Sequence, residues 1–295
     1  MAATEQTADA LNATFAVDGL RFEGGGPGGL VRGVISTPTC DGEFFLHGAQ
    51  VTHWRPSGHD DVLWLSPTAR YEDGKAIRGG IPICFPWFGA HMTDPGAPSH
   101  GLARTRRWEL RSAHRAGDTI EVALSADIAP WACVLTASFA AELRVTLSVT
   151  NTDGTPAEFE AGLHSYFAVE AIEHVTIGGL ESSGYTDQVA GNALRPASGE
   201  PIGFTGEVDR IYDVTSPSLA SIEDGRRRIE VEGRNSRSTV VWNPASEKAR
   251  ALADVGENEW RRFVCVETAN VRERRVRLGP GETSSVTARV RVARR

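Results

Sequence analysis

The sequence predicts an all-β protein, a large antiparallel β-sandwich with a few short helices. Apolar and polar residues alternate with a period of two in several segments, which is typical of strands that bury one face. Clusters of Gly, Pro, Asn and Asp separate these segments, and no linker-like change of composition interrupts the chain after residue 30. We therefore expect one domain over residues 20–295, preceded by an N-terminal segment, residues 1–19, that is either frayed or a short helix.

The first predicted strands follow a glycine-rich break, GGGPGG, at residues 24–29. We expect strands at residues 30–36 and 43–54, joined by a turn at residues 40–42. A second turn, Arg-Pro-Ser-Gly, leads into a further strand at residues 62–66.

The clearest alternation lies at residues 119–124 and 143–149, where Ile, Val and Leu occupy every second position. The sequence Asn-Thr-Asp-Gly at 151–154 predicts a hairpin turn into a strand at 157–169. Further strands are predicted at residues 229–231, 239–242, 263–267 and 286–292. Short helical turns are predicted only at residues 244–255 and 69–73.

Composition and charge exclude several classes of partner. The net charge of −7 argues against a nucleic-acid binder or an anionic-membrane binder, each of which carries a basic surface. The four cysteines are scattered without a CxxC spacing, which indicates buried reduced thiols. The first residues lack the basic and apolar regions of a signal peptide, and no run of 18 apolar residues occurs. We therefore expect a cytoplasmic protein with no nucleic-acid and no membrane partner.

A loop at residues 75–108 combines features that a plain connecting segment lacks. Its prolines and glycines oppose regular structure, yet it is rich in Ile, Phe and Trp. The basic or titratable side chains on it include Lys75, Arg78, His91, His100 and Arg104. The loop either folds around a ligand or packs on its own aromatic residues, and the basic side chains favour the ligand.

Two segments carry candidates for acid–base chemistry. In residues 159–167, strand alternation places His164 and Tyr166 on one face beside Gly162, which leaves space for a ligand. In residues 263–268, Glu267 interrupts an apolar strand, and burial of a carboxylate there would raise its pKa towards that of a general base. The alternatives are a hydrogen-bonded structural histidine and a salt bridge at the end of the strand.

Three cations together could bind a phosphate. Lys75 and Arg78 follow a predicted turn, and Arg55 ends an earlier strand, so we expect the three to converge on one edge. Surface solubility is the alternative for each of them. The sequence contains no HExxH motif and no acidic cluster, and we expect neither a catalytic metal nor a cofactor.

Six motifs taken together resemble the glucose-6-phosphate 1-epimerases, the hexose-6-phosphate mutarotase branch of the aldose 1-epimerase superfamily. They occur in the order of that family: KAIRGGIPICFPWFG (75–89), SHGLART (99–105), LHSYF (163–167), DRIY (209–212), VVWNP (240–244) and FVCVET (263–268). The resemblance covers residues 30 to 292. Ala245 and Thr268 depart from the residue types expected after two of these motifs.

This resemblance implies a galactose mutarotase-like β-sandwich that interconverts the α and β anomers of a hexose 6-phosphate. It implies that Glu267 is the catalytic base and His164 the catalytic acid. The implied substrate-binding residues are Arg55, Lys75, Arg78, His100, Arg104 and Asp209. We expect a monomer that acts on a small sugar phosphate. Two alternatives remain: an aldose 1-epimerase for unphosphorylated sugars, and a non-catalytic carbohydrate-binding or regulatory sandwich.

Overall fold

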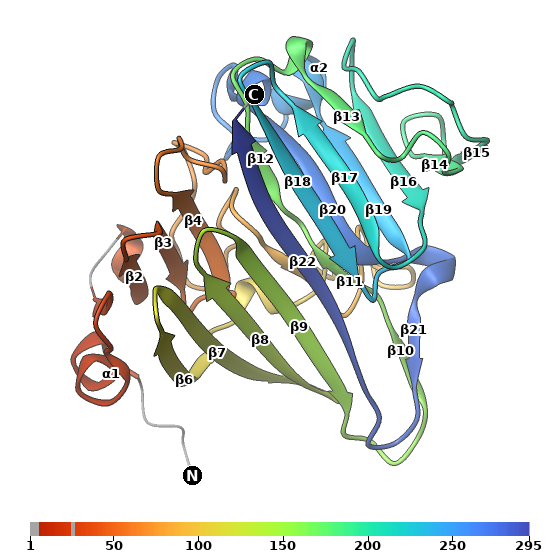
Figure 1. Ribbon diagram of the computed structural model, residues 1–295. Helices are drawn as coiled ribbons and strands as arrows, with labels where there is room; N and C mark the ends of the chain where they lie inside the picture. The colour runs from red at the N-terminus through yellow and green to blue at the C-terminus, as the bar shows by residue number, and fades with distance from the viewer. Residues whose placement is uncertain (1–5, 25–26, 295) are drawn as a thin grey trace.

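The computed structural model of the chain describes residues 6–24 and 27–294, and two large antiparallel sheets dominate it (Figure 1). The first sheet has the order β15 (Ala193–Arg195), β14 (Tyr185–Asp187), β16 (Val208–Asp213), β19 (Ser238–Asn243), β20 (Phe263–Asn270), β11 (Ala161–Leu163) and β5 (Ile83–Cys84), and β12 (Tyr166–Ala168) also pairs with β20. The second has the order β13 (Thr176–Gly178), β17 (Ser218–Glu223), β18 (Arg227–Arg234), β22 (Thr283–Arg294), β9 (Leu143–Asn151), β8 (Trp131–Phe139), β7 (Thr119–Ile128) and β6 (Glu109–Ala116). The predicted all-β class is confirmed.

Two smaller sheets and a few short helices complete the described chain. One sheet contains β1 (Leu20–Glu23), β2 (Arg32–Ser36), β3 (Cys40–Phe45) and β4 (Gln50–Pro56), and the other contains β10 (Ala157–Phe159) and β21 (Val276–Leu278). The α-helices are α1 (Ala8–Phe15) and α2 (Ala245–Ala249). Single 3-10 turns lie at Pro27–Gly29, Ala103–Thr105, Ile172–His174, Glu259–Arg262 and Arg272–Arg274.

The alternating segments form strands because they can bury one face against the core. In β7 the side chains of Ile120, Val122 and Leu124 are 0 to 1% exposed, whereas the intervening Thr119, Glu121 and Ala123 are more accessible. β9 and β22 show the same pattern, as their sequences predict. Most buried apolar residues form one cluster, which extends from α1 to β22, and the described chain also contains two smaller clusters.

The N-terminal segment forms a helix that packs on this core. The Thr7 side chain accepts a hydrogen bond from the Ala10 N–H at the helix start, and Leu11 is buried. The Asn12 side chain exchanges hydrogen bonds of 2.7 and 2.8 Å with the backbone of Phe22 in β1. Residues 1–5 of the predicted N-terminal segment, and Gly25 and Gly26 of the predicted glycine-rich break, lie outside the described residues.

Three predictions near the N-terminus are wrong. Residues 40–42 begin β3, and the turn lies before them, where the Thr37 N–H donates to the Cys40 carbonyl. The strand predicted at 43–54 is divided, because Gly48 and Ala49 have φ values of 72° and 46° that no strand accommodates. Residues 62–66 form only isolated bridges, Leu63 to Phe167 and Leu65 to Gly79.

The prediction for residues 151–169 is also wrong in its pairing. β9 pairs with β8 and β22, whereas β10 pairs with β21, so residues 151–154 do not close a hairpin. The Asn151 side chain instead donates to the carbonyls of Thr155 and Leu278, which ties the turn to β21. The predicted single strand is three short strands, β10, β11 and β12.

The other predictions have mixed outcomes. The helix predicted at 244–255 is present only as the five residues of α2, and residues 69–73 are not helical, with a turn that begins at Asp73. All four cysteines are free and buried, as expected. Among the described residues, no helix is both long enough and apolar enough to span a membrane.

Candidate active site

Glu267 lies in β20, a fully buried strand of the first sheet. Every residue of β20 is buried, because β19 pairs along one edge of it and β11 and β12 along the other. Glu267 itself is 1% exposed, and its Oε2 atom has no hydrogen-bond partner in the described chain. Burial of an ionised carboxylate in such a strand costs free energy unless a ligand or a neighbouring group binds or neutralises it.

His164 lies at the junction between β11 and β12. The sheet pairing fixes the backbone there, since the His164 N–H donates to the Pro82 carbonyl over 3.0 Å. Its ring stacks on that of Tyr166, with centroids 4.8 Å apart and an interplanar angle of 7°, and Trp242 packs against its edge. These aromatic contacts hold the imidazole in one orientation.

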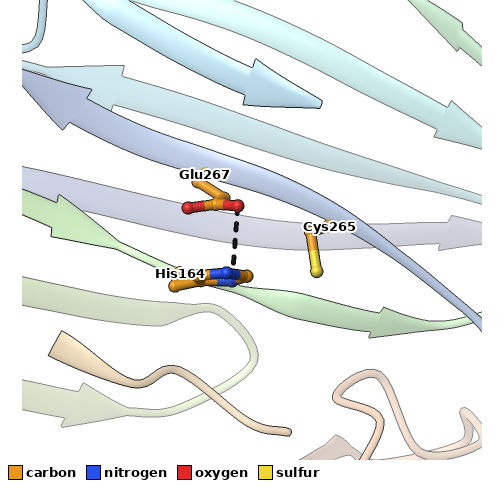
Figure 2. Close-up of side chains that lie close together, drawn as sticks. All are labelled: His164, Cys265 and Glu267. Carbon is orange, nitrogen blue, oxygen red and sulfur yellow. Dashed lines mark ion pairs between the residues drawn. The ribbon is translucent and has the colours of Figure 1, made fainter. Parts of the chain in front are cut away.

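The structure brings the two predicted catalytic groups together. His164 Nδ1 lies 3.3 Å from Glu267 Oε1, although the geometry does not meet that of a hydrogen bond (Figure 2). Both side chains line the same pocket, which has a volume of about 440 Å³ and opens to solvent. A sugar that enters the pocket can therefore contact the carboxylate and the imidazole at once.

Burial shifts the pKa of each group towards its neutral form. Desolvation raises the pKa of Glu267 well above its ordinary value, and the negative charge of Asp209 adds to this effect. Desolvation lowers the pKa of His164 well below its ordinary value, and the cationic form is further disfavoured by His100, Arg104 and Arg78. Burial therefore favours a neutral pair, with the shared proton on the carboxyl group.

These pKa shifts predict how stability depends on pH. The raised pKa of Glu267 means that above pH 4.5, its ordinary value, the unfolded chain loses a proton that the folded protein keeps. The free energy of unfolding then falls as pH rises, by up to about 1.4 kcal/mol per pH unit. The glutamine of Glu267→Gln cannot ionise. We therefore expect the stability of this variant relative to the wild type to be greater at pH 8 than at pH 5, and the variant to be the more stable protein at pH 8.

Urea unfolding of both proteins at pH 5, 6.5 and 8 measures this difference. The lowered pKa of His164 affects stability only below about pH 6.5, where the unfolded chain takes up a proton, so it does not disturb the comparison at higher pH. A stability difference that is constant from pH 5 to pH 8 would show that Glu267 titrates normally in the folded protein.

His100 forms a wall of the pocket beside Glu267 and His164. Its ring lies 5.4 Å from that of His164, and it packs edge-on against Phe88. Desolvation lowers the pKa of His100 to about 3, so the ring is neutral at pH 7. The Gly89 N–H donates to Nδ1, which leaves Nε2 to carry the ring proton. His100 is therefore placed to donate a hydrogen bond.

Asp209 enters the pocket from β16 within a small polar network. It accepts a 2.5 Å hydrogen bond from Gln188 Nε2, and Lys248 Nζ lies 3.6 Å from its other oxygen. Burial raises the pKa of Asp209, whereas Gln188 and Lys248 oppose that shift. The network fixes the position of the carboxyl group, which suits it to binding sugar hydroxyls.

Arg78 and Arg104 also line the pocket, but their environments differ. Arg78 donates to the Tyr166 hydroxyl and forms an ion pair of 3.1 Å with Asp254. Arg104 donates to the Ser99 carbonyl, and its Nε atom is buried without a hydrogen-bond partner among the described residues. Arg78 is thus neutralised by Asp254, whereas no carboxylate in the described part of the chain forms an ion pair with Arg104.

The predicted convergence of Arg55, Lys75 and Arg78 is wrong. Arg55 forms a 2.5 Å ion pair with Asp41 across β3 and β4, and it lines a different pocket. Lys75 is exposed, and its loop is fixed by a contact of 2.6 Å between its carbonyl and His47 Nε2. Neither side chain lines the pocket that contains Glu267 and His164.

Other residues supply the pocket with charge and apolar surface that the sequence analysis did not identify. These are Phe88, Gln188, Trp242, Lys248, Leu252 and Arg272. Arg272 donates to Gln188 Oε1 over 2.9 Å, and it follows β20 in a loop with a positive φ of 57°. Its position depends on loop geometry, so no sequence pattern indicated it.

The fold and the site together define a class of protein, acid–base isomerases of sugars built on a galactose mutarotase-like sandwich. The family model described as aldose 1-epimerase matches residues 34–291. The chain belongs to the aldose 1-epimerase family, whose members are isomerases.

Named relatives and solved structures agree with this assignment. Proteins of Cenchrus ciliaris and Escherichia coli K12, both named “putative glucose-6-phosphate 1-epimerase”, are 34% and 32% identical to the chain. The first match covers 87% of this chain and 83% of the relative, and the second covers 89% and 90%. The crystal structure of “a putative mutarotase (YeaD)” from Salmonella typhimurium matches with a TM-score of 0.87 and 26% identity, over 95% of both chains.

Proposed function

We propose that the protein interconverts the α and β anomers of a hexose 6-phosphate, with glucose 6-phosphate as the first candidate. The observation that carries this proposal is the Glu267–His164 pair, 3.3 Å apart in a pocket that also contains four basic side chains. The basic side chains are Arg78, Arg104, Lys248 and Arg272. The names of the relatives from Cenchrus ciliaris and Escherichia coli support the same substrate.

In this proposal the pair passes one proton back and forth. Hydroxyl groups of a bound sugar donate to Glu267, replace the hydrogen bonds that burial removed, and so favour its ionised form. The proton then moves over the 3.3 Å from Oε1 to His164 Nδ1. Glu267 is then an ionised base and His164 a protonated acid, which is the state that ring opening requires.

Glu267 removes the proton of the C1 hydroxyl while His164 gives a proton to the ring oxygen, and the ring opens. Rotation about the C1–C2 bond turns the aldehyde over. Reclosure reverses both proton transfers and regenerates the starting pair, so the reaction consumes no co-reactant. The Nε2–H of His100 hydrogen-bonds to oxygen as charge shifts, and Asp209 holds hydroxyl groups of the sugar.

We place the 6-phosphate against Arg104 and Arg272. In the described chain neither guanidinium forms an ion pair with a carboxylate, whereas Arg78 pairs with Asp254 and Lys248 with Glu207 and Asp209. An unpaired guanidinium binds a phosphate through forked hydrogen bonds without first breaking an ion pair. Arg104 and Arg272, like Arg78, each lower the pKa of His100 electrostatically, so each lies near that ring.

This placement predicts selective losses in binding. Replacing Arg104 or Arg272 by glutamine should raise KM for glucose 6-phosphate by about 10- to 100-fold, since a charge-assisted hydrogen bond contributes about 1.5–3 kcal/mol. KM for unphosphorylated glucose should change little. Arg55→Gln and Lys75→Gln are the matched controls, because those side chains lie outside the pocket, and both should behave as wild type. Equal losses for both sugars in the Arg104 and Arg272 variants would remove the phosphate assignment.

Exchange between the anomers, measured by magnetisation-transfer NMR, tests the function itself. The protein should accelerate α–β exchange of glucose 6-phosphate well above the spontaneous rate, and more than it accelerates exchange of glucose. Greater acceleration of glucose would indicate an aldose 1-epimerase without phosphate specificity. Binding without acceleration of either sugar would indicate a carbohydrate-binding protein and refute the proposal.

A further inference from the structure

A third side chain that could coordinate a metal ion, Cys265, lies beside Glu267 and His164. Cys265 precedes Glu267 by two residues on β20, so strand alternation places both side chains on one face of the sheet (Figure 2). Ligand atoms of His164, Cys265 and Glu267 all lie within 4.8 Å of one another, and all three residues are buried. The sulfur atom does not line the sugar pocket, and the proposed anomerisation does not use it.

We infer that this cluster is an inhibitory site for a thiophilic divalent cation such as Zn²⁺. The chemistry fits, because imidazole, thiolate and carboxylate are the three ligand types that Zn²⁺ takes in proteins. A tetrahedral ion with bonds of about 2.0 Å separates a nitrogen and an oxygen ligand by about 3.3 Å. The distance between His164 Nδ1 and Glu267 Oε1 is 3.3 Å.

Two unsatisfied atoms support this inference independently of the spacing. His164 Nδ1 and Glu267 Oε2 are buried, and neither has a hydrogen-bond partner in the part of the chain that the structure describes. Such atoms are normally satisfied by a neighbour or a ligand. A bond of about 2.3 Å to Cys265 would place its sulfur about 3.5 Å from the other ligand atoms, so a side-chain adjustment of about 1 Å completes the site.

The bound ion would occupy the two groups that transfer protons to the sugar. Three protein ligands leave the fourth position open towards the pocket, where water or another exchangeable ligand completes the tetrahedron. Coordination displaces two protons to solvent, the thiol proton of Cys265 and the carboxyl proton of Glu267, and no electrons are transferred. The cation and the sugar phosphate should therefore exclude each other.

Titration with Co²⁺, the spectroscopic substitute for Zn²⁺, tests the inference without reference to turnover. The wild-type protein should develop a near-ultraviolet sulfur-to-cobalt charge-transfer band together with the visible bands of a tetrahedral ion. Zn²⁺ should abolish both signals by displacement, and glucose 6-phosphate should weaken them by competition. If the protein proved not to be an anomerase, the sulfur band would still report the metal site.

Cys265→Ala and Cys265→Ser are the decisive variants, and Cys133→Ala is the matched control. Cys133 is equally buried but lies on β8 in the other large sheet. We expect the Cys265 variants to lose the charge-transfer band and to bind Zn²⁺ at least 10- to 100-fold more weakly, because even loss of an outer-shell partner has an effect of that size. They should keep their anomerisation rate, with Zn²⁺ inhibition weakened to match. No charge-transfer band in the wild type, or equal Zn²⁺ affinity in the Cys265 and Cys133 variants, would overturn the inference.

Discussion

Glu267→Gln is expected to slow anomerisation of glucose 6-phosphate by about 10²- to 10⁴-fold, the usual contribution of a positioned general base. Glutamine keeps the shape of the side chain but cannot accept the proton of the C1 hydroxyl. The pocket is otherwise unchanged, so the dissociation constant of the sugar phosphate should stay within a few fold of the wild-type value. The measurements are NMR exchange rates for turnover and calorimetry for binding.

Glu142→Gln is the control for this variant. Glu142 pairs with Arg289 on the second sheet, remote from the pocket, so its loss should leave exchange unaffected. If Glu267→Gln turned the sugar over at a near-normal rate, Glu267 could not be the base. Loss of binding as well as turnover would indicate that Glu267 mainly holds the substrate.

His164→Asn should lower turnover by a similar factor and change its dependence on pH. The pKa of His164 lies below its ordinary value of 6.5, because burial and neighbouring cations disfavour the imidazolium. A second proton therefore reaches the pair only below pH 6.5, where it leaves no base and the wild-type rate should fall. The variant keeps only Glu267, whose pKa burial raises, so its residual rate should decline at a higher pH than the wild-type rate does.

His174→Asn provides the comparison for the histidine. His174 lies in an exposed 3-10 turn, outside the pocket, so both the rate and its pH profile should match those of the wild type. An acidic decline that persists unchanged in His164→Asn would assign that ionisation to another group. Asp209 would then be the next candidate, because it lies in the same pocket.

The long strands could be predicted because their burial follows a simple period. β7, β9 and β22 each expose every second residue to solvent, and that pattern is visible in the sequence alone. The errors occur where pairing is not local. The residues at 151–154 look like a hairpin turn, but β9 pairs with β22 and β10 with β21, partners more than a hundred residues away.

The residues of the candidate site likewise fall into those that local sequence indicates and those that it does not. Glu267 and His164 were predicted because a carboxylate in an apolar strand and a histidine beside a small residue are unusual locally. The cations were predicted less well, because strand order rather than sequence neighbourhood decides which of them meet. Arg55 is held across a hairpin by Asp41, whereas Arg272 reaches the pocket from a loop after β20.

A double-mutant cycle tests most directly whether the carboxylate and the imidazole act as one unit. It compares α–β exchange of glucose 6-phosphate for the wild type, Glu267→Gln, His164→Asn and the variant that carries both changes. If one proton passes between the two groups, the double variant should be no slower than the slower single variant. Losses that multiply, so that the double variant falls by the product of the two factors, would show that the groups act independently and would contradict this mechanism.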